Sequence, residues 1–401
     1  MAVAEPGEPT PAELDAWRLK LRAWLEAHIP AWWRSERWAT PFEVSESRFA
    51  DVRAWQRSLF DAGYMGLRWP RAYGGQGLSL AHEFARAEEF QRAKAPPVAN
   101  VLGLTLCAPA LLEFASDAQK RRFLPKILSA EELWVQGYSE PGAGSDLAGL
   151  STRAEPGPDG WTVNGQKIWT TNGMHGDWIF CLVRTDPAAK KQEGIGFLLI
   201  DMKTPGIEVR PIVNATTARD FCEVFLNDVR VPAENMVGEP TQGWQIANHV
   251  LRHERGADIS VLRYGDQLAE IAEHARRTRR GITRQSDDAR FRQRWAQLRV
   301  EFEVLRRGVL TALEDLKDGR SPGPETSRFK LQQSEFEQRL MRLATDVQGP
   351  YGQLWLDGPR GLDGGIWQWR ELWSRAYTIY GGSSEIQRNI LSERVLGLPR
   401  G

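Results

Sequence analysis

The hydrophobic period of this chain changes twice, and these two changes constrain the fold more than any other feature. From Pro11 to about Ala130, apolar residues recur every three or four positions, which is the period of an amphipathic helix. From about Glu132, short runs of β-branched and aromatic residues alternate with turns, which is typical of strands. After Val237-Gly238 the helical period returns and continues to the end. This order predicts an α+β multidomain protein.

A chain of 401 residues is longer than a typical single domain, so the changes in hydrophobic period are interpreted as domain boundaries. We predict four parts: a loose N-terminal tail (1–12), an N-terminal helical domain (13–131), a central β domain resembling a barrel (132–240) and a C-terminal helical bundle (241–401). Three local signals refine this division. Ser116 is a candidate N-cap for the helix that follows, Asn164-Gly165 is a hairpin signal, and residues 319–327 predict a loop between two long helices.

Composition excludes several classes of function. Acidic and basic residues balance at 52 each, so the chain has no net positive charge to attract nucleic acid or an anionic membrane. The three cysteines lie far apart without a CxxC spacing, which argues against a disulfide framework or a zinc site and favours a reducing compartment. The first residues lack the features of a targeting peptide, and no run of about 18 apolar residues exists. We therefore expect a cytoplasmic protein without membrane insertion.

One carboxylate interrupts an apolar helix face. The helix after Gly243 carries an apolar stripe made of Ala247, Val250, Leu251, Val261 and Leu262. Glu254 lies four residues after Val250 and therefore falls within this stripe. Burial of a carboxylate is costly and raises its pKa. Two interpretations stay open at this point: a buried ion pair, with His253 or an arginine of another helix, or a general base in a dry pocket.

Three further segments contain residues that suit a ligand. The loop YSEPGAGSDLAG (138–149) combines hydroxyl groups with glycines that let a backbone pass close to a ligand. The strand end IWTTNG (168–173) offers an aromatic face and two hydroxyl groups, which suits a flat heterocycle. The segment GGSSE (381–385) resembles a capping box at the start of a helix, where free amides bind anions. Each could also be an ordinary turn or element end. The arginine-rich segment 276–294 is either a solvated helix face or a phosphate contact.

Taken together, these motifs closely resemble the acyl-CoA dehydrogenase family from about residue 13 to residue 400. The resemblance implies a C-terminal four-helix bundle, and FAD bound between it and the β domain and partly covered by a neighbouring subunit. It implies an acyl-CoA substrate, electron transfer flavoprotein as acceptor, and a homodimer or homotetramer, with a heteromer as an alternative. By matching positions, the cofactor contacts would be Tyr138, Ser139, Gly144, Ser145, Trp169, Thr171, Arg277, Ser383 and Glu385. The substrate contacts would be Ser145, Arg255 and Gly382.

The position of the catalytic base distinguishes two branches of this family. Many members carry a glutamate immediately after the tyrosine of the C-terminal motif, and this chain has Gly381 there. A branch that includes isovaleryl- and long-chain-type enzymes instead holds the glutamate on the bundle helix before an arginine, and Glu254-Arg255 matches that pattern. The resemblance therefore predicts that Glu254 removes the α-proton while the β-hydrogen leaves as hydride. Gly381 also leaves room for a branched, long or cyclic acyl group.

Two departures from the family pattern keep other functions open. Residues 346–350 (Asp-Val-Gln-Gly-Pro) replace the usual Gly-Gly-x-Gly run, and the FGxP-like turn is degenerate at residues 280–282. The family's intersubunit contacts to FAD around Gln348 are therefore not matched residue by residue in this chain. The alternatives are a non-catalytic or half-site subunit of a heteromeric acyl-CoA dehydrogenase, and an oxidase or monooxygenase on the same fold.

Overall fold

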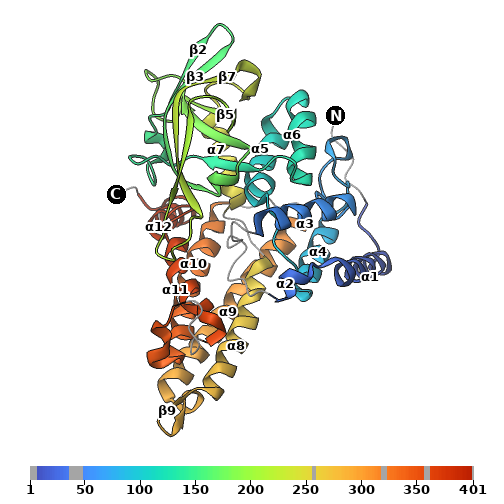
Figure 1. The fold of residues 1–401 in the computed structure, drawn as a ribbon, viewed down its shortest axis with the longest axis vertical. Helices are drawn as coiled ribbons and strands as arrows, with labels where there is room; N and C mark the ends of the chain where they lie inside the picture. The colour runs from blue at the N-terminus through green and yellow to red at the C-terminus, as the bar shows by residue number, and fades with distance from the viewer. Residues whose placement is uncertain (1–6, 36–47, 255–258, 318–322, 356–361, 400–401) are drawn as a thin grey trace. The chain divides into compact units, whose positions relative to one another are not determined.

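The computed structural model describes residues 7–35, 48–254, 259–317, 323–355 and 362–399 (Figure 1). The chain divides into two compact units. Unit 1 comprises Met1–Leu19, Phe42–Arg86 and Pro96–Glu254, and unit 2 comprises Lys20–Pro41, Ala87–Ala95 and Arg255–Gly401. Among the described helices, none has the length and apolar character required to cross a bilayer.

Unit 1 combines helices with one mixed sheet. Its helices are α3 (Phe49–Asp61), η2 (Arg71–Tyr73), η3 (Gly103–Cys107), α5 (Ala108–Phe114), α6 (Asp117–Ser129), η4 (Leu147–Gly149), η5 (Gly173–His175), η6 (Ala233–Asn235) and α7 (Gly243–Glu254). Helices α1 (Pro11–His28) and α4 (Leu80–Arg92) contribute residues to both units. The strands are β1 (Trp134–Gly137), β2 (Arg153–Gly157), β3 (Gly160–Thr171), β4 (Trp178–Arg184), β5 (Ile195–Asp201), β6 (Ile207–Ile212), β7 (Phe221–Pro232) and β8 (Met236–Val237).

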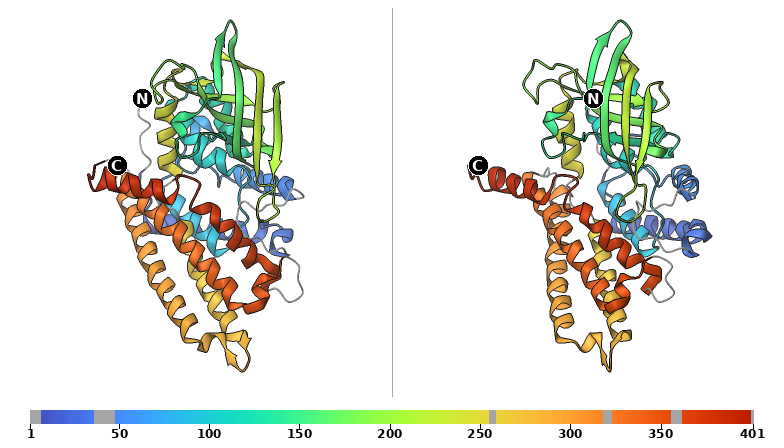
Figure 2. Two further views of the ribbon diagram at one scale, coloured as in Figure 1. Left: turned by 90° about the vertical axis from the view of Figure 1, so that its left-hand side faces the viewer. Right: turned by 60° about the vertical axis from the view of Figure 1, so that its left-hand side comes forward.

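The sheet has the order β6-β7-β3-β2-β4-β5-β8, with β1 added parallel to β4. Strand β4 is buried on both faces. Phe180 and Leu182 of β4 belong to a cluster shared with α5, α6 and α7, whereas Ile179, Cys181 and Val183 belong to a second cluster shared with β3 and β7. Successive side chains of a strand point to opposite faces, so these two clusters lie on the two sides of the sheet. The second cluster combines side chains of β1, β2, β3, β4, β5 and β7, so the sheet curls around it and the β domain is barrel-like, as predicted. Figure 2 shows the strands of this sheet.

Two local predictions in unit 1 have opposite outcomes. Ser116 caps α6 in a complete capping box, in which its Oγ accepts from Gln119 N at 3.2 Å and its own N–H donates to Gln119 Oε1 at 2.9 Å. The hairpin prediction at Asn164-Gly165 is wrong, because both residues lie inside β3 at an irregularity of the β3–β7 ladder. Gly165 is required there because a Cβ would lie 2.5 Å from the hydroxyl of Thr152.

Unit 2 is a helical bundle with a short hairpin. Its elements are α2 (Ala31–Ser35), η7 (Ile259–Leu262), α8 (Arg263–Arg277), β9 (Arg279–Arg280), β10 (Thr283–Arg284), η8 (Gln285–Asp287), α9 (Ala289–Lys317), η9 (Pro324–Thr326), α10 (Ser327–Val347), η10 (Gly349–Gln353), η11 (Leu362–Gly365), α11 (Ile366–Tyr377), α12 (Ser384–Ile390) and η12 (Leu391–Val395). Helix α10 contacts α8, α9 and α11, and these four helices form the predicted bundle. Buried side chains line its interior, among them Tyr264, Leu268, Phe302, Leu305, Phe336, Leu340, Trp367 and Trp373.

The apolar stripe predicted around Glu254 does not continue along one described helix. Ile246, Ala247 and Val250 of α7 are fully buried, as the stripe requires. The helix is described to Glu254, residues 255–258 lie outside the described residues, and Val261 belongs to the separate 3-10 helix η7. The described part of the stripe therefore ends with α7.

Candidate active site

A loop that follows β1 exposes its glycines to solvent. We name residues 138–145 the glycine loop. Tyr138 anchors its start, since its ring packs edge-on against Phe180 with centroids 5.9 Å apart. Glu140 and Ala143 exchange two backbone hydrogen bonds of 3.0 Å, which close a tight turn. Gly142, Gly144 and Ser145 are exposed at the tip of this turn.

The protein's own packing does not require glycine in this loop. A Cβ built on Gly142 or Gly144 would meet no atom within 4 Å, and neither residue adopts a positive φ. Glycine is otherwise needed where a backbone approaches a ligand closely. The two glycines therefore leave open space of the kind that a bound cofactor requires.

The predicted aromatic residue lies at a strained turn in β3. We name residues 168–172 the tryptophan turn. Trp169 has φ +62° and is 56% exposed, and the β3–β7 ladder shifts its register between Lys167 and Thr170. A positive φ is an outlier for a bulky residue, and such strain concentrates at functional sites. The bulge places the Trp169 ring at the surface, edge-on to Phe221 at 6.1 Å between centroids. Thr171 is half-buried and pairs with Phe221.

A backbone hydrogen bond joins these two segments. Ile168 N donates to the carbonyl oxygen of Ser139 at 2.9 Å. The structure thus brings together, within unit 1, the predicted cofactor contacts of both motifs: Tyr138, Ser139, Gly144, Ser145, Trp169 and Thr171.

An ion pair that was not predicted lies beneath this junction. Lys167 Nζ lies 2.7 Å from Glu140 Oε1, and the two residues are 0% and 6% exposed. Burial by itself raises the pKa of Glu140, but the Lys167 charge and hydrogen bonds from Lys167, Thr152 and Ser151 outweigh it and lower the pKa to about 2. The sequence shows only that a charged residue lies in the glycine loop and another directly before the tryptophan turn.

The predicted base lies at the end of a helix that buries one face. Glu254 is the last residue of α7, one helical turn after the fully buried Val250. The side chain of Glu254 lies outside the described residues, and so does the whole of Arg255.

The C-terminal motif forms a tight turn before α12. Gly381 and Gly382 have φ of 63° and 89°. The fully buried Gln387 donates to both carbonyl oxygens, at 2.9 Å and 3.0 Å, and this residue was not predicted. Ser383 is the N-cap, as predicted, and accepts from Ile386 N. Glu385 is exposed and lies one position before Ile386, so the predicted capping box does not form.

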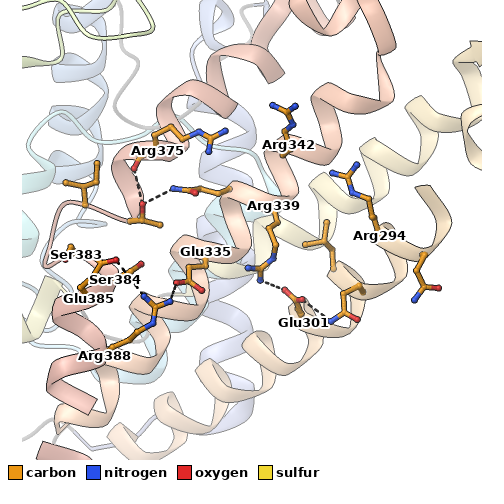
Figure 3. Close-up of a pocket in the computed structure, with 16 residues that line it drawn as sticks. Arg294, Glu301, Glu335, Arg339, Arg342, Arg375, Ser383, Ser384, Glu385 and Arg388 are labelled. Carbon is orange, nitrogen blue, oxygen red and sulfur yellow. Dashed lines mark hydrogen bonds and ion pairs between the residues drawn. The ribbon is translucent and has the colours of Figure 1, made fainter. Parts of the chain in front are cut away.

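Ser383 and Glu385 line a cavity of about 910 Å³ between α9, α10, α11 and α12 (Figure 3). Its wall carries five arginines, Arg294, Arg339, Arg342, Arg375 and Arg388. Each is paired with a carboxylate; for example, Arg339 lies 2.5 Å from Glu301, and Arg388 contacts Glu335. Arg277 is not among the lining residues. It pairs with Glu273 at 2.7 Å near the β9–β10 hairpin, at the other end of the bundle.

Comparisons with known proteins agree over the whole chain. The models of the N-terminal, middle and C-terminal domains of acyl-CoA dehydrogenase match residues 11–131, 136–229 and 241–396. The chain is 39% identical to acyl-CoA dehydrogenase IpdE1 of Mycobacterium tuberculosis over 390 residues, which are 97% of this chain and 98% of the relative.

Two solved structures are also similar. The ChsE4-ChsE5 complex from Mycobacterium tuberculosis has a TM-score of 0.82 and 31% identity, covering 99% of this chain and 100% of that chain. The Tcur3481-Tcur3483 steroid ACAD has a TM-score of 0.84 and 28% identity, covering 98% and 99%. The fold and the matched domains define a flavin-dependent oxidoreductase. The chain belongs to the acyl-CoA dehydrogenase family, whose members use FAD.

The residues present fit this cofactor. The exposed ring of Trp169 offers a surface on which a flat heterocycle can stack. The open space over Gly144, next to Ser145 in the sequence, leaves room for the polar edge of that heterocycle. No group of three or more His, Cys, Asp or Glu suited to a metal ion occurs within the described ranges.

Proposed function

We propose that this chain dehydrogenates an acyl-CoA thioester between its α and β carbons, with Glu254 as the base. Bound FAD supplies the acceptor for the β-hydrogen. Glu254 would remove the α-proton, and its place one helical turn after the fully buried Val250 supports that role. The observation that carries the proposal is the junction of the glycine loop with the tryptophan turn, because it forms one exposed face from both predicted cofactor motifs.

We assign the contacts to this chain's residues as follows. Tyr138, Ser139, Gly144, Ser145, Trp169, Thr171, Arg277, Ser383 and Glu385 would bind FAD. Ser145, Arg255 and the backbone amide near Gly382 would bind the thioester. A hydrogen bond to the carbonyl oxygen makes the α-proton more acidic.

A Glu254→Gln variant tests the base. We expect acyl-CoA to bleach the flavin about 100- to 10,000-fold more slowly than in the wild type, since that is the usual contribution of a general base. Anaerobic stopped-flow measurement with a panel of acyl-CoAs gives this rate and also identifies the substrate. Glu239→Gln is the matched control, because Glu239 is an exposed carboxylate just before α7. Bleaching by Glu254→Gln at near the wild-type rate, with FAD bound, would refute the assignment.

We infer a branched or cyclic acyl group. Gly381 carries no side chain where many family members have glutamate, and its φ of 63° disfavours one. A solved relative at 28% identity is titled a steroid ACAD. A straight-chain acyl-CoA that bleaches the flavin faster than any branched or ring-containing one would contradict this inference.

A half-site role in a heteromer is a second candidate. Gln348 is buried, donates to Ala344 O at 3.2 Å and accepts from Gln368 at 3.0 Å, so it packs within the bundle and is not exposed for an intersubunit contact. Two similar solved structures are described by paired chain names. Purification of this chain alone, followed by measurement of bound FAD per chain, distinguishes the two: a homo-oligomer retains yellow FAD, whereas a half-site subunit does not.

We propose the four-part division at 12, 131 and 240, electron transfer flavoprotein as acceptor, and a cytoplasmic location. The location is supported by Cys107, Cys181 and Cys222, which are all buried and free. Rapid reoxidation of the reduced flavin by air would instead favour an oxygen-using enzyme.

A further inference from the structure

A buried charge network lies directly beneath the glycine loop. Glu140 Oε1 accepts from Lys167 Nζ at 2.7 Å and from Thr152 N at 2.9 Å, and Glu140 Oε2 accepts from Ser151 N at 2.7 Å and Ser151 Oγ at 2.8 Å. Lys167 Nζ also donates to Tyr138 O at 3.3 Å. Both carboxylate oxygens and the ammonium group are thus satisfied by this chain alone.

The network connects three segments that are distant in sequence. Glu140 belongs to the glycine loop, Ser151 and Thr152 immediately precede β2, and Lys167 lies two residues before the strained Trp169. The segment that follows the loop is held separately, since Arg184 Nη2 donates to Ala148 O at 2.7 Å. The exposed tip with Gly142, Gly144 and Ser145 therefore lies between two points that hydrogen bonds fix, Glu140 before it and Ala148 after it.

Stability alone is a poor explanation for such a pair. Removing two charges from water is expensive, and apolar replacements of similar volume are often as stable as a buried ion pair. What a directed ion pair supplies, and an apolar contact does not, is one fixed relative position of its partners. Here those partners are the glycine loop and the tryptophan turn.

We propose that Glu140 and Lys167 are positioning residues for FAD, which hold the glycine loop in register with Trp169. This inference rests on the proposed placement of both segments at the flavin. Neither side chain is exposed, so both act through the backbone of the loop and of the turn and do not contact the cofactor.

The test compares FAD binding with stability in Glu140→Gln, Lys167→Met and the double variant. Glu89→Gln is the matched control, because Glu89 is also a buried carboxylate held by arginine, 2.8 Å from Arg22, but lies in unit 2. For each protein, thermal unfolding of the apoprotein, the dissociation constant of FAD, the visible flavin spectrum and the flavin midpoint potential are measured.

We expect Glu140→Gln to weaken FAD binding by about tenfold or more and to alter the flavin spectrum, whereas Glu89→Gln lowers the unfolding temperature but keeps the dissociation constant within about twofold. Lys167→Met leaves the carboxylate uncompensated and should be the least stable. The double variant should regain part of the unfolding temperature without regaining FAD affinity.

A milder variant covers the case in which Glu140→Gln does not fold. Ser151→Ala removes only the hydroxyl hydrogen bond to Glu140, on an exposed residue, and should weaken FAD binding about threefold. The inference is overturned if the folded variants keep wild-type FAD affinity and spectrum, or if FAD affinity falls only in proportion to stability, as in Glu89→Gln. These readouts need no turnover, so they stay informative even if Glu254 proves not to be the base.

Discussion

The backbone N–H of Ile168 lies 2.9 Å from the carbonyl oxygen of Ser139, and this bond joins two sequence motifs into one surface. Each motif alone is an ordinary loop or strand end. Because Ile168 immediately precedes Trp169, the bond fixes where the strained tryptophan lies relative to the exposed glycines. The surface that we propose for the cofactor in unit 1 is therefore a product of the β1–β3 arrangement and not of either motif.

The strained backbone at Trp169 predicts that a glycine variant is more stable than an alanine variant. Its φ of +62° suits glycine but not alanine, so Trp169→Gly should be more stable than Trp169→Ala by about 1 kcal/mol. Both variants lose the same contact with Phe221 and the same exposed ring, so FAD binding should weaken in both. Urea unfolding of the apoproteins measures the difference. Equal stability of the two variants would show that the backbone at 169 is not left-handed in solution.

The open space at Gly144 predicts separate effects on stability and cofactor binding. Gly144→Ala should leave the unfolding free energy of the apoprotein unchanged or raise it by up to about 1 kcal/mol, because alanine restricts the unfolded chain and meets no atom in the folded one. FAD binding should nevertheless weaken about tenfold, as measured by flavin fluorescence titration.

Gly165→Ala is the matched control for this prediction. Its φ is +154°, and its Cβ would lie 2.5 Å from the hydroxyl oxygen of Thr152, so the apoprotein should lose more than about 1 kcal/mol. A Gly144→Ala protein that binds FAD as the wild type does would remove the glycine loop from the cofactor site.

We predict that the rigidity of the C-terminal turn depends on Gln387. Its Nε2 donates to the carbonyl oxygens of Gly381 and Gly382 while the residue is fully buried. Gln387→Met keeps the volume but leaves both carbonyl oxygens without this donor, which should cost about 1–3 kcal/mol. Thermal unfolding measures the loss, and hydrogen exchange of the amides at 381–386 should become faster. Unchanged exchange at these amides would mean that the turn does not depend on Gln387.

Two buried carboxylates predict how stability responds to acid. The pKa of Glu140 and that of Glu89 are each lowered to about 2 in the folded protein, the latter chiefly by its hydrogen bond from Arg22. A lowered folded pKa means that the stabilisation is complete above the unfolded value of 4.5 and is lost as the pH falls towards 2. Cys181, beside Lys167, has its pKa raised by burial to about 11 and stays neutral throughout.

For Glu140 the difference between 4.5 and about 2 corresponds to roughly 3 kcal/mol. Urea unfolding from pH 7 to pH 2.5 should show little change above pH 5 and a steep loss below it. Glu140→Gln and Glu89→Gln should each show a shallower loss in the same window. An acid response in both variants as steep as in the wild type would contradict these lowered pKa values.

Features that depend only on neighbouring residues could be predicted from the sequence. Ser116 and Gln119 are three residues apart, so their capping box depends on neighbours alone, and the prediction of that cap is confirmed. The order of helical, β and helical segments follows from hydrophobic period, which is also local. Asn164-Gly165 has the chemistry of a hairpin, yet Thr152 on the neighbouring segment leaves space only for glycine there, and the chain forms a bulge within a continuous strand.

The tertiary structure alone decided how the motifs meet. Nothing in the spacing of Glu140 and Lys167 indicates that they pair, because a contact across β1 and β3 depends on strand order and register. The same holds for the left-handed Trp169, whose strain is maintained by the ladder with β7. Sequence determined the elements and the family, since these depend on nearby residues, whereas the tertiary fold decided which side chains share one buried volume.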